Sequence, residues 1–378
     1  MLSAVFLAVV PVVVHDQYFL SVLILCLIYG ILASGWDFLE GYLGQVNFGY
    51  AGFFGLGAYA SALIAMRLGV SPWLAIFFGG FFAAAIGLGV GFPCLRLSPG
   101  YVAIVTLAFA EIARLIVTRW VELTNGMNGL WGIPPFPDIT IGGFRIDMSG
   151  VDRTPHYYLI LAITVASLFL MRKLVDSRTG LLFLAIREDK DLAEGLGVDT
   201  TRHKLIGFTI SSFMAGLVGG FFAHYVNTLS PEMLGVAVTV QICAMAVIGG
   251  RATLFGPVLG GFLLIGSGEV LRPIFEYRMI IFGLLIVVFL TLFPEGLAGI
   301  AGYFRSVAKR STEDQVVRAD TGVSSPTTTL ASYLRNAGLA RGLTEPKRFG
   351  NTSYKNGSCA HSGERIWNWL SNRCQKRS

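Results

Sequence analysis

The 378-residue chain is 54% hydrophobic and only 14% charged, and its mean hydropathy is +0.64. Soluble domains carry about 25% charged residues, so this composition excludes an ordinary water-soluble globule. Repeated apolar runs of about 20 residues match the thickness of a bilayer core, and the short alternating strands of a membrane β-barrel do not occur. The sequence therefore predicts an all-α polytopic membrane protein.

The net charge of +6 is unevenly distributed along the chain. Residues 1–303 hold 16 Lys and Arg against 18 Asp and Glu, whereas residues 304–378 hold 13 against 5. The basic excess therefore belongs to the C-terminal part, and the body gives no reason to expect nucleic-acid binding. Because residues 304–378 are polar and lack an apolar period, we predict a disordered tail there and a transmembrane domain over residues 1–303.

Apolar segments follow one another through the transmembrane domain. Shorter ones occur at 2–14, 237–249 and 258–271, and a further helix is expected to end near Met66. Together with the longer runs they predict about eight to ten transmembrane helices. The clearest spans are expected at 17–35, 72–92, 101–118, 157–171, 205–223 and 277–292.

The loops predict an orientation in the membrane. Seven Lys and Arg residues lie between residues 172 and 204, and basic loops tend to stay in the cytoplasm. The polar loop at 119–156, one span earlier, is then outside. An even number of spans places the N-terminus and the C-terminus on the cytoplasmic side with the basic loop.

The glycine-rich run at residues 41–59 has two interpretations. Six glycines between Gly41 and Gly57 disfavour a regular helix, because Gly loses more conformational freedom on folding than other residues. Irregular backbone at membrane depth is tolerated only where protein or a water-filled cavity covers it, so the run is a candidate pathway lining. The alternative is a loop followed by a tightly packed helix. In either case the candidate pathway or structural polar residues are Gln45, Asn47 and Tyr59.

Other glycines recur at the four-residue spacing that lets helices approach closely in lipid. This spacing favours helix packing over a specific functional role. The pairs are Gly87 with Gly91, Gly216 with Gly220, and Gly256 with Gly260.

The span at 101–118 carries two charged residues, Glu111 and Arg114. Their spacing of three places them on one face of a helix, and ionisable groups inside a bilayer are costly and often functional. They form either a structural ion pair against neighbouring helices or part of a polar pathway.

The stretch at residues 184–204 is the most densely charged part of the transmembrane domain. The acids Glu188, Asp189 and Asp191 suit the positive end of a short helix, Gly197 is a natural helix stop, and Asp199 can cap the helix that follows. A short helix held between two spans is a shape that another protein can grip. An ordinary solvated loop is the alternative.

Motifs for catalysis are missing from the sequence. It contains no phosphate-binding Gly-x-x-x-x-Gly-Lys-Ser/Thr loop, no His-Glu-x-x-His pair and no Ser nucleophile elbow. The five His and five Cys residues are scattered without the spacing of a metal site or a disulfide framework. We therefore expect neither an enzyme nor a bound metal or other cofactor.

Several stretches resemble the permease subunit of a bacterial ATP-binding cassette importer for branched-chain amino acids, a family that also includes urea permeases. Their order and spacing agree over nearly all of residues 17–300. The stretches that carry the resemblance lie at 44–59, 101–114, 184–211, 249–260 and 292–297.

The resemblance implies that the charged stretch is a coupling loop that docks on a cytoplasmic ATPase subunit. The residues assigned to ATPase coupling are Arg187, Glu188, Asp189, Ala193, Glu194 and Gly197. It also implies an inner-membrane location and four kinds of partner besides membrane lipid: cytoplasmic ATP-binding subunits, a second homologous permease subunit, a periplasmic substrate-binding protein, and a small amino acid as substrate.

The chain departs from the family pattern in places. Asp37 stands where Asn is expected, Tyr50 stands where His is common, and Gly195 lies inside the expected coupling helix. Gly at that position lowers helix propensity by about 1 kcal/mol, which puts the stability of that helix in doubt.

Two alternatives remain open at the level of the sequence. The substrate of such an importer could be urea or another small amide or amino acid instead of leucine, isoleucine or valine. A second class is an ion-coupled secondary transporter, in which Glu111 and Arg114 would form a proton or ion relay. That class predicts uptake without ATPase subunits.

Overall fold

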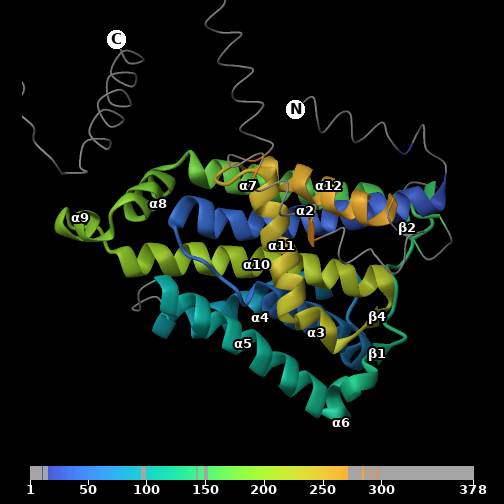
Figure 1. Ribbon diagram of the computed structural model, residues 1–378. Coiled ribbons are helices and arrows are strands. Elements are labelled where there is room, and N and C mark those ends of the chain that lie inside the picture. The colour runs from blue at the N-terminus through green and yellow to red at the C-terminus, as the bar shows by residue number, and fades with distance from the viewer. Residues whose placement is uncertain are drawn as a thin grey trace, which may run out of the picture. The chain divides into compact units, whose positions relative to one another are not determined.

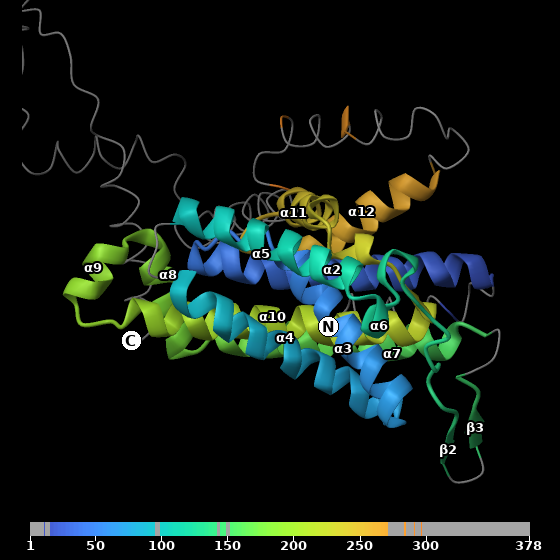
Figure 2. The same ribbon diagram turned by 90° about the horizontal axis from the view of Figure 1, so that it is seen from below.

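The computed structural model describes residues 11, 16–94, 99–141, 144–148, 152–270, 283, 284, 291 and 296. These residues fall within one compact unit, Met1–Lys309, and most of them are helical (Figures 1 and 2). In this part of the chain, six helices are long and apolar enough to cross a membrane. The prediction of an all-α polytopic membrane protein is therefore confirmed.

The first half of the described chain begins with α2 (Gln17–Leu43). Asp16 caps the N-terminus of this helix by accepting a hydrogen bond from the Tyr18 amide. Short elements fill the loop expected at 119–156. The elements up to that point are α3 (Tyr50–Leu68), α4 (Pro72–Cys94), α5 (Pro99–Arg119), α6 (Val121–Thr124), η1 (Gly126–Asn128), β1 (Leu130–Trp131), β2 (Ile139–Ile141) and β3 (Phe144–Ile146).

The second half contains α10, which at 27 residues is as long as α2. Its elements are α7 (Thr154–Val175), α8 (Arg178–Glu188), α9 (Lys190–Gly195), α10 (Thr200–Val226), β4 (Thr228–Leu229), η2 (Pro231–Leu234), α11 (Val236–Gly249) and α12 (Gly256–Val270). The strands form only two small antiparallel pairs within the described residues, β1 with β4 and β2 with β3.

Helix α10 lies at the centre of the bundle, packed on α4 and α3 on one side and on α2 on the other (Figure 1). Small residues make this packing close. A Cβ atom added at Gly220 would lie 2.9 Å from the Cα of Ile76 in α4, and one at Gly216 would lie 3.2 Å from the Cα of Gly80. The pair Gly216 and Gly220 therefore has the role in helix packing that its spacing predicted.

The two ends of the bundle differ in structure. Helices α8 and α9 project at one end, whereas α6, β2 and β3 lie at the opposite end (Figures 1 and 2). At the second end, the ring of Phe136 is fully buried. It lies 5.0 Å from the Trp73 ring and 5.6 Å from the His224 ring, measured between centroids. This aromatic cluster anchors the loop after β1 onto the helices.

The structure corrects several boundaries. The span expected at 17–35 continues to Leu43, because Asp37 and Glu40 find partners at the end of α2 and do not terminate it. The glycine-rich run is irregular only over residues 44–49, and the rest is helical, which matches the interpretation of a loop followed by a packed helix. The spans expected at 237–249 and 258–271 correspond to the short helices α11 and α12.

The predicted segments 2–14 and 277–292 and the tail at 304–378 lie almost wholly outside the described residues. The count of eight to ten spans and the proposed domain boundary near residue 303 therefore remain predictions.

Candidate coupling and pathway site

The charged stretch at residues 184–204 covers the end of α8, the whole of α9 and the start of α10. Helix α8 ends at Glu188 and α9 begins at Lys190, with Asp189 between them in an extended conformation. The Asp189 carboxylate accepts a hydrogen bond from the Leu192 amide at 3.0 Å, so this residue starts a new helix. The short helix predicted to start at the acidic residues corresponds to α9, since Asp189 is its N-cap. Glu188 lies before this start, as the last residue of α8.

The other end of α9 is closed by backbone hydrogen bonds. The Gly197 amide donates to the Glu194 carbonyl at 2.9 Å, and the Val198 amide donates to the Ala193 carbonyl at 3.1 Å. Gly197 has φ of 85°, a left-handed conformation that favours glycine at helix ends. The predicted helix stop at Gly197 agrees with this geometry. Gly195 is the last residue of α9, so the cost in helix propensity falls at the end of the helix.

Glu194 ties α9 to the start of α10. Its carboxylate accepts a hydrogen bond from the Thr200 hydroxyl at 2.5 Å and lies 3.6 Å from the Lys190 ammonium. The hydrogen bond from Thr200 holds the pKa of Glu194 below its ordinary value, and the Lys190 charge acts in the same direction. Asp199 caps α10 by accepting from the Arg202 amide at 3.0 Å, so the loop is held at both sides.

Two exposed leucines that were not among the predicted site residues lie in α9 and directly after it. Leu192 is 63% exposed and Leu196 is 78% exposed, whereas Ala193 between them is only 3% exposed. Residues four apart lie on one helix face, so both leucines point away from the body together. The four-residue spacing of these two leucines within a charged stretch could have indicated an exposed apolar face from the sequence.

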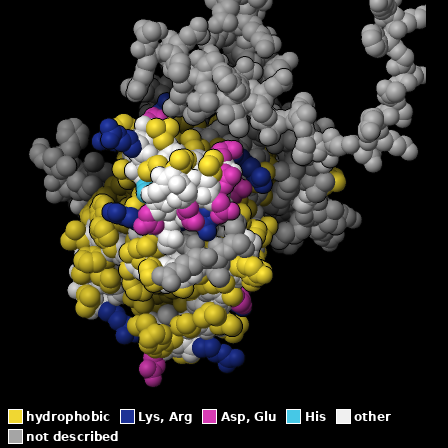
Figure 3. Space-filling model, turned by 90° about the vertical axis from the view of Figure 1, so that its left-hand side faces the viewer, with side chains coloured by type: hydrophobic (Ala, Val, Ile, Leu, Met, Phe, Trp, Pro, Cys, Tyr) yellow, Lys and Arg dark blue, Asp and Glu magenta, His cyan; other side chains and the backbone are white. Residues whose placement is uncertain are grey.

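Exposed charged residues are close to this apolar pair in the sequence, among them Glu188, Asp191 and Glu194. Figure 3 looks onto the end of the molecule that α8 and α9 form, where acidic and basic side chains gather while hydrophobic side chains cover the flanks. This end therefore offers exposed apolar and charged side chains together, as protein-binding surfaces do.

The loop that carries α8 and α9 is connected to the C-terminal end of α2. The Arg187 guanidinium donates to the Gly41 carbonyl. Gly44, which ends α2 with φ of 70°, faces the Arg187 side chain, and a Cβ added there would lie 3.3 Å from the Arg187 Cγ. The predicted coupling residue Arg187 therefore holds the last turn of α2, next to the break in the backbone.

The same end of α2 holds the loop between α11 and α12. The buried carboxylate of Asp37 accepts from the Ala252 amide at 3.0 Å and from the Thr253 amide at 3.2 Å. Arg251 lies 3.8 Å from Glu40 across the same contact. Ala252 has φ of 57°, a conformation that costs energy for a residue with a side chain. In the sequence, Asp37 stood out only as the end of an expected span and as a departure from the family pattern.

Residues 44–49 form a break between α2 and α3 that protein surrounds. The Trp36 indole donates to the Asn47 carbonyl at 2.8 Å, and the Gly49 amide donates to the Asn47 side chain at 2.9 Å. The Phe48 amide donates to the Thr106 hydroxyl of α5 at 3.1 Å. The Gln45 side-chain oxygen is buried without a partner within the described part of the chain, so it has unused hydrogen-bonding capacity.

The remaining predicted polar residues lie apart from this break. The Tyr59 hydroxyl is buried among apolar side chains of α5 and α10 and has no partner among the described residues. On α5, the Arg114 guanidinium donates to both oxygens of Glu111 at 2.5–3.1 Å. The two side chains remain 32% and 38% exposed, so the pair is on the outside of this chain.

Comparison with known proteins gives these features a family. The family described as the branched-chain amino acid transport system permease component matches residues 18–290. LivM, a high-affinity branched-chain amino acid transport system permease protein of Salmonella typhimurium strain LT2, is 36% identical over 72% of this chain and 68% of its own length. LivM of Escherichia coli strain K12 is 35% identical over the same shares.

LivH of Escherichia coli strain K12, named as another permease protein of that system, is 25% identical over 72% of this chain and 91% of its own length. No solved structure matches the chain. With more than half of the chain covered by the family match, the protein belongs to the family of permease components of branched-chain amino acid transport systems.

Proposed function

We propose that this chain is the membrane-spanning permease subunit of an ATP-binding cassette importer that moves leucine, isoleucine or valine across a bacterial inner membrane. The single observation that carries the proposal is the 36% identity to a branched-chain amino acid permease over most of the chain. The structure supports it with a short capped helix at one end of a bundle of apolar spans. This arrangement suits a subunit that receives force from a partner and has no nucleotide-binding motif of its own.

Helix α9 is the proposed docking element for an ATPase subunit. The exposed Leu192 and Leu196 would enter an apolar groove of the partner, as amphipathic helices do, and Glu188 and Asp191 would lie on a charged rim. The caps at Asp189 and Gly197 fix the helix before the partner arrives, which reduces the entropy lost on binding.

The end of α2 is the proposed route from the docking helix to the transport pathway. Arg187 contacts Gly41, and Asp37 contacts the loop after α11, so a displacement of α8 and α9 acts on one helical turn that also holds α11 and α12. That turn leads directly into the break at residues 44–49. Interrupted helices commonly form substrate sites in transporters, and Gln45 and Asn47 are the residues we assign to that role.

The outer face of α5 is the proposed contact with the second permease subunit. An ion pair that remains one-third exposed on a membrane helix is costly against lipid, so another protein surface or an aqueous pathway must cover Glu111 and Arg114. Large apolar side chains on the same helix are exposed in this chain, including Ile104, Ile112 and Ile116. A homologous permease subunit would bury them.

The end opposite α9 is the proposed meeting point with a periplasmic substrate-binding protein. It carries the paired strands β1 and β4 and the exposed side chains of Met127 and Trp131. With α8 and α9 in the cytoplasm, as the basic loop predicts, this end faces the periplasm and both chain termini lie inside. We assign substrate choice largely to the binding protein.

The proposal is tested by uptake of radiolabelled leucine in vesicles that contain the full set of subunits. Glu188→Lys and Gly197→Trp are expected to reduce both ATP-driven uptake and retention of the ATPase subunits strongly. Glu122→Lys, at the opposite end, is the control for ATPase retention. Competition by isoleucine and valine, and the absence of competition by urea, would support the substrate assignment.

An ion-coupled transporter gives the opposite pattern. Uptake that persists without ATPase subunits and disappears with an uncoupler would contradict the importer and favour a relay through Glu111 and Arg114.

A further inference from the structure

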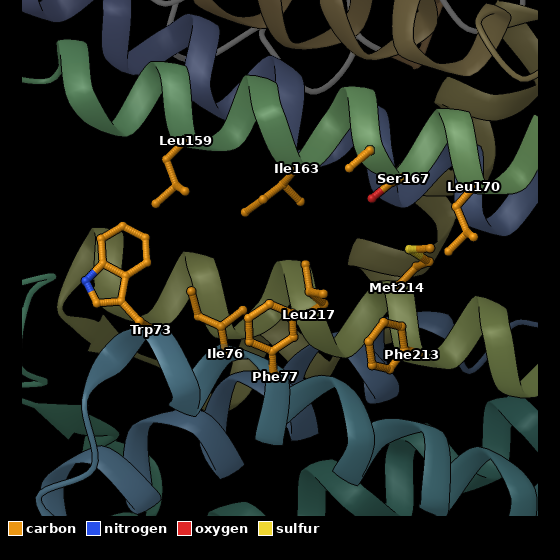
Figure 4. Close-up of a pocket in the computed structure, with 11 residues that line it drawn as sticks. Trp73, Ile76, Phe77, Leu159, Ile163, Ser167, Leu170, Phe213, Met214 and Leu217 are labelled. Atoms are coloured by element: carbon orange, nitrogen blue, oxygen red, sulfur yellow. The ribbon is translucent and has the colours of Figure 1, made fainter.

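An apolar groove runs along α10 on the side where α4 and α7 face each other. Two adjoining hollows of about 270 and 470 Å³ share three lining residues, Leu170, Phe213 and Met214. Figure 4 shows side chains of α7 on one side of the first hollow and side chains of α4 and α10 on the other. Because the hollows share these residues, they form one continuous groove from Trp73 at one end to Leu174 at the other.

The lining of the groove is almost entirely hydrocarbon. The side chains with oxygen atoms are those of Ser167 and Thr209, and the Thr209 hydroxyl donates to the Leu205 carbonyl of its own helix at 2.7 Å. A polar ligand would find few partners there. A flexible hydrocarbon chain needs none, and hollows of this size suit such a chain better than a helix about 10 Å across.

The groove is also a gap in the packing of the helices. Helix α7 packs mainly on α2 and makes little contact with α10, so the space between α7 and α10 is closed only in part by protein. Protein interiors are normally close-packed. An occupant of the groove would therefore contribute contacts that hold α7 against the rest of the bundle.

Two cations stand at the end of the groove that lies towards α8 and α9. Lys173 follows the lining residue Leu170 by three residues, and Arg202 precedes the lining residue Thr209 by seven residues, so each lies on the groove side of its helix. Both are exposed, and within the described residues neither takes part in an ion pair. Arg172, on the opposite face of α7, pairs with Asp176 at 3.6 Å.

We propose that the groove binds one anionic phospholipid, with an acyl chain along α10 and the phosphate between Lys173 and Arg202. Basic pockets at the cytoplasmic ends of membrane helices bind anionic head groups, and the apolar lining continues directly from this basic end. The assignment to the cytoplasmic leaflet rests on the proposed orientation of the coupling loop, whereas the lipid site itself does not.

In the test, the full-length chain and its permease and ATPase partners are placed together in nanodiscs of mixed phosphatidylglycerol and phosphatidylcholine. The complex is then purified, and the phosphatidylglycerol that it retains is measured. Native mass spectrometry counts the bound lipid. The double variant Lys173→Glu/Arg202→Glu is expected to lower phosphatidylglycerol retention about tenfold or more, since each basic residue near a membrane surface adds about 1 kcal/mol. Arg172→Glu is the matched control and is expected to retain the lipid.

A second variant tests the acyl chain without changing charge. Ala166→Phe places a ring in the first hollow and is expected to displace the lipid while the subunits still co-purify. Equal retention in the charge-reversed and wild-type proteins would overturn the proposal. So would a cross-link between cysteines introduced at Ala4 and Ala166, because it would place the N-terminal segment in the groove. Neither readout depends on ATP-driven transport, so failure here is distinguishable from failure of the proposed function.

Discussion

Asp37 and Ala252 are 215 positions apart in the chain, yet the Asp37 carboxylate accepts the Ala252 amide hydrogen bond at 3.0 Å. The same carboxylate holds the Thr253 amide, and its residue is fully buried. Arg187 donates a hydrogen bond to the Gly41 carbonyl one turn further along α2. The end of α2 is therefore joined both to the proposed coupling loop and to the turn between α11 and α12. This junction is the structural basis of the proposed force transmission.

Removal of the Asp37 carboxylate is expected to destabilise the junction. Asp37→Ala leaves two backbone donors without their acceptor, a loss of about 1–3 kcal/mol for each buried unsatisfied group, whereas Asp37→Asn keeps one acceptor and should lose less. Thermal unfolding of the purified complex and ATP-driven leucine uptake measure the effect. Asp176→Ala, at an exposed carboxylate, is the control, and equal behaviour of Asp37→Ala and this control would remove Asp37 from the proposed route.

Close packing of α10 makes a second prediction. Gly216→Val is expected to destabilise the bundle by about 1–3 kcal/mol through overpacking, because an added Cβ would meet the backbone of α4. Gly89→Val in α4 is the matched control, since nothing lies within 4 Å of a Cβ added there. The melting temperatures of the two variants are compared in the same detergent. A larger drop in melting temperature for Gly89→Val than for Gly216→Val would contradict the close packing of α10 on α4.

The hydrogen bond between Glu194 and Thr200 predicts that the connection between α9 and α10 is weakened by acid. The pKa of Glu194 is held below its ordinary value of 4.5, so the stabilisation is fully present above that pH and is lost as pH falls through the lowered pKa. Thr200→Val removes the main cause and should bring the pKa of Glu194 back towards 4.5. A nuclear magnetic resonance titration of the labelled Glu194 carboxyl carbon follows the change, and an identical titration in both proteins would refute it.

Variants of the ion pair on α5 can distinguish a role in subunit packing from a role in the transport pathway. Glu111→Gln leaves Arg114 without its charge partner and is expected to reduce co-purification of the second permease subunit. The exchanged pair Glu111→Arg/Arg114→Glu restores opposite charges and should recover assembly if the pair only packs at the interface. Recovery of assembly without recovery of leucine uptake would instead assign the pair to the transport pathway.

The fold could be predicted from sequence where local signals decide it. Apolar runs located the long helices, and Gly197 and Asp199 marked a helix stop and a helix start because their effects act within a few residues. The last two turns of α2 could not be predicted. Asp37 and Glu40 look like the end of a span until the distant loop at residues 250–253 supplies their partners.

The proposed docking surface on α9 was predicted only in part, for a similar reason. The charged stretch and the family resemblance indicated its residues, but charge density directed attention to Glu188 and Glu194 and away from the leucines. The exposure of Leu192 and Leu196 depends on how Ala193 packs against the body, which is a tertiary feature. The division at Asp189 between α8 and α9 determines that face.

The most direct measurement of the central claim is co-purification of the ATPase subunits with the full-length permease carrying Leu192→Asp/Leu196→Asp. The docking role of α9 predicts that the double variant loses the ATPase subunits and ATP-driven leucine uptake. Met127→Asp, at an equally exposed residue of the opposite end, should keep the ATPase subunits bound. Unchanged ATPase recovery and uptake in the double variant would contradict the assignment of α9 as the coupling helix.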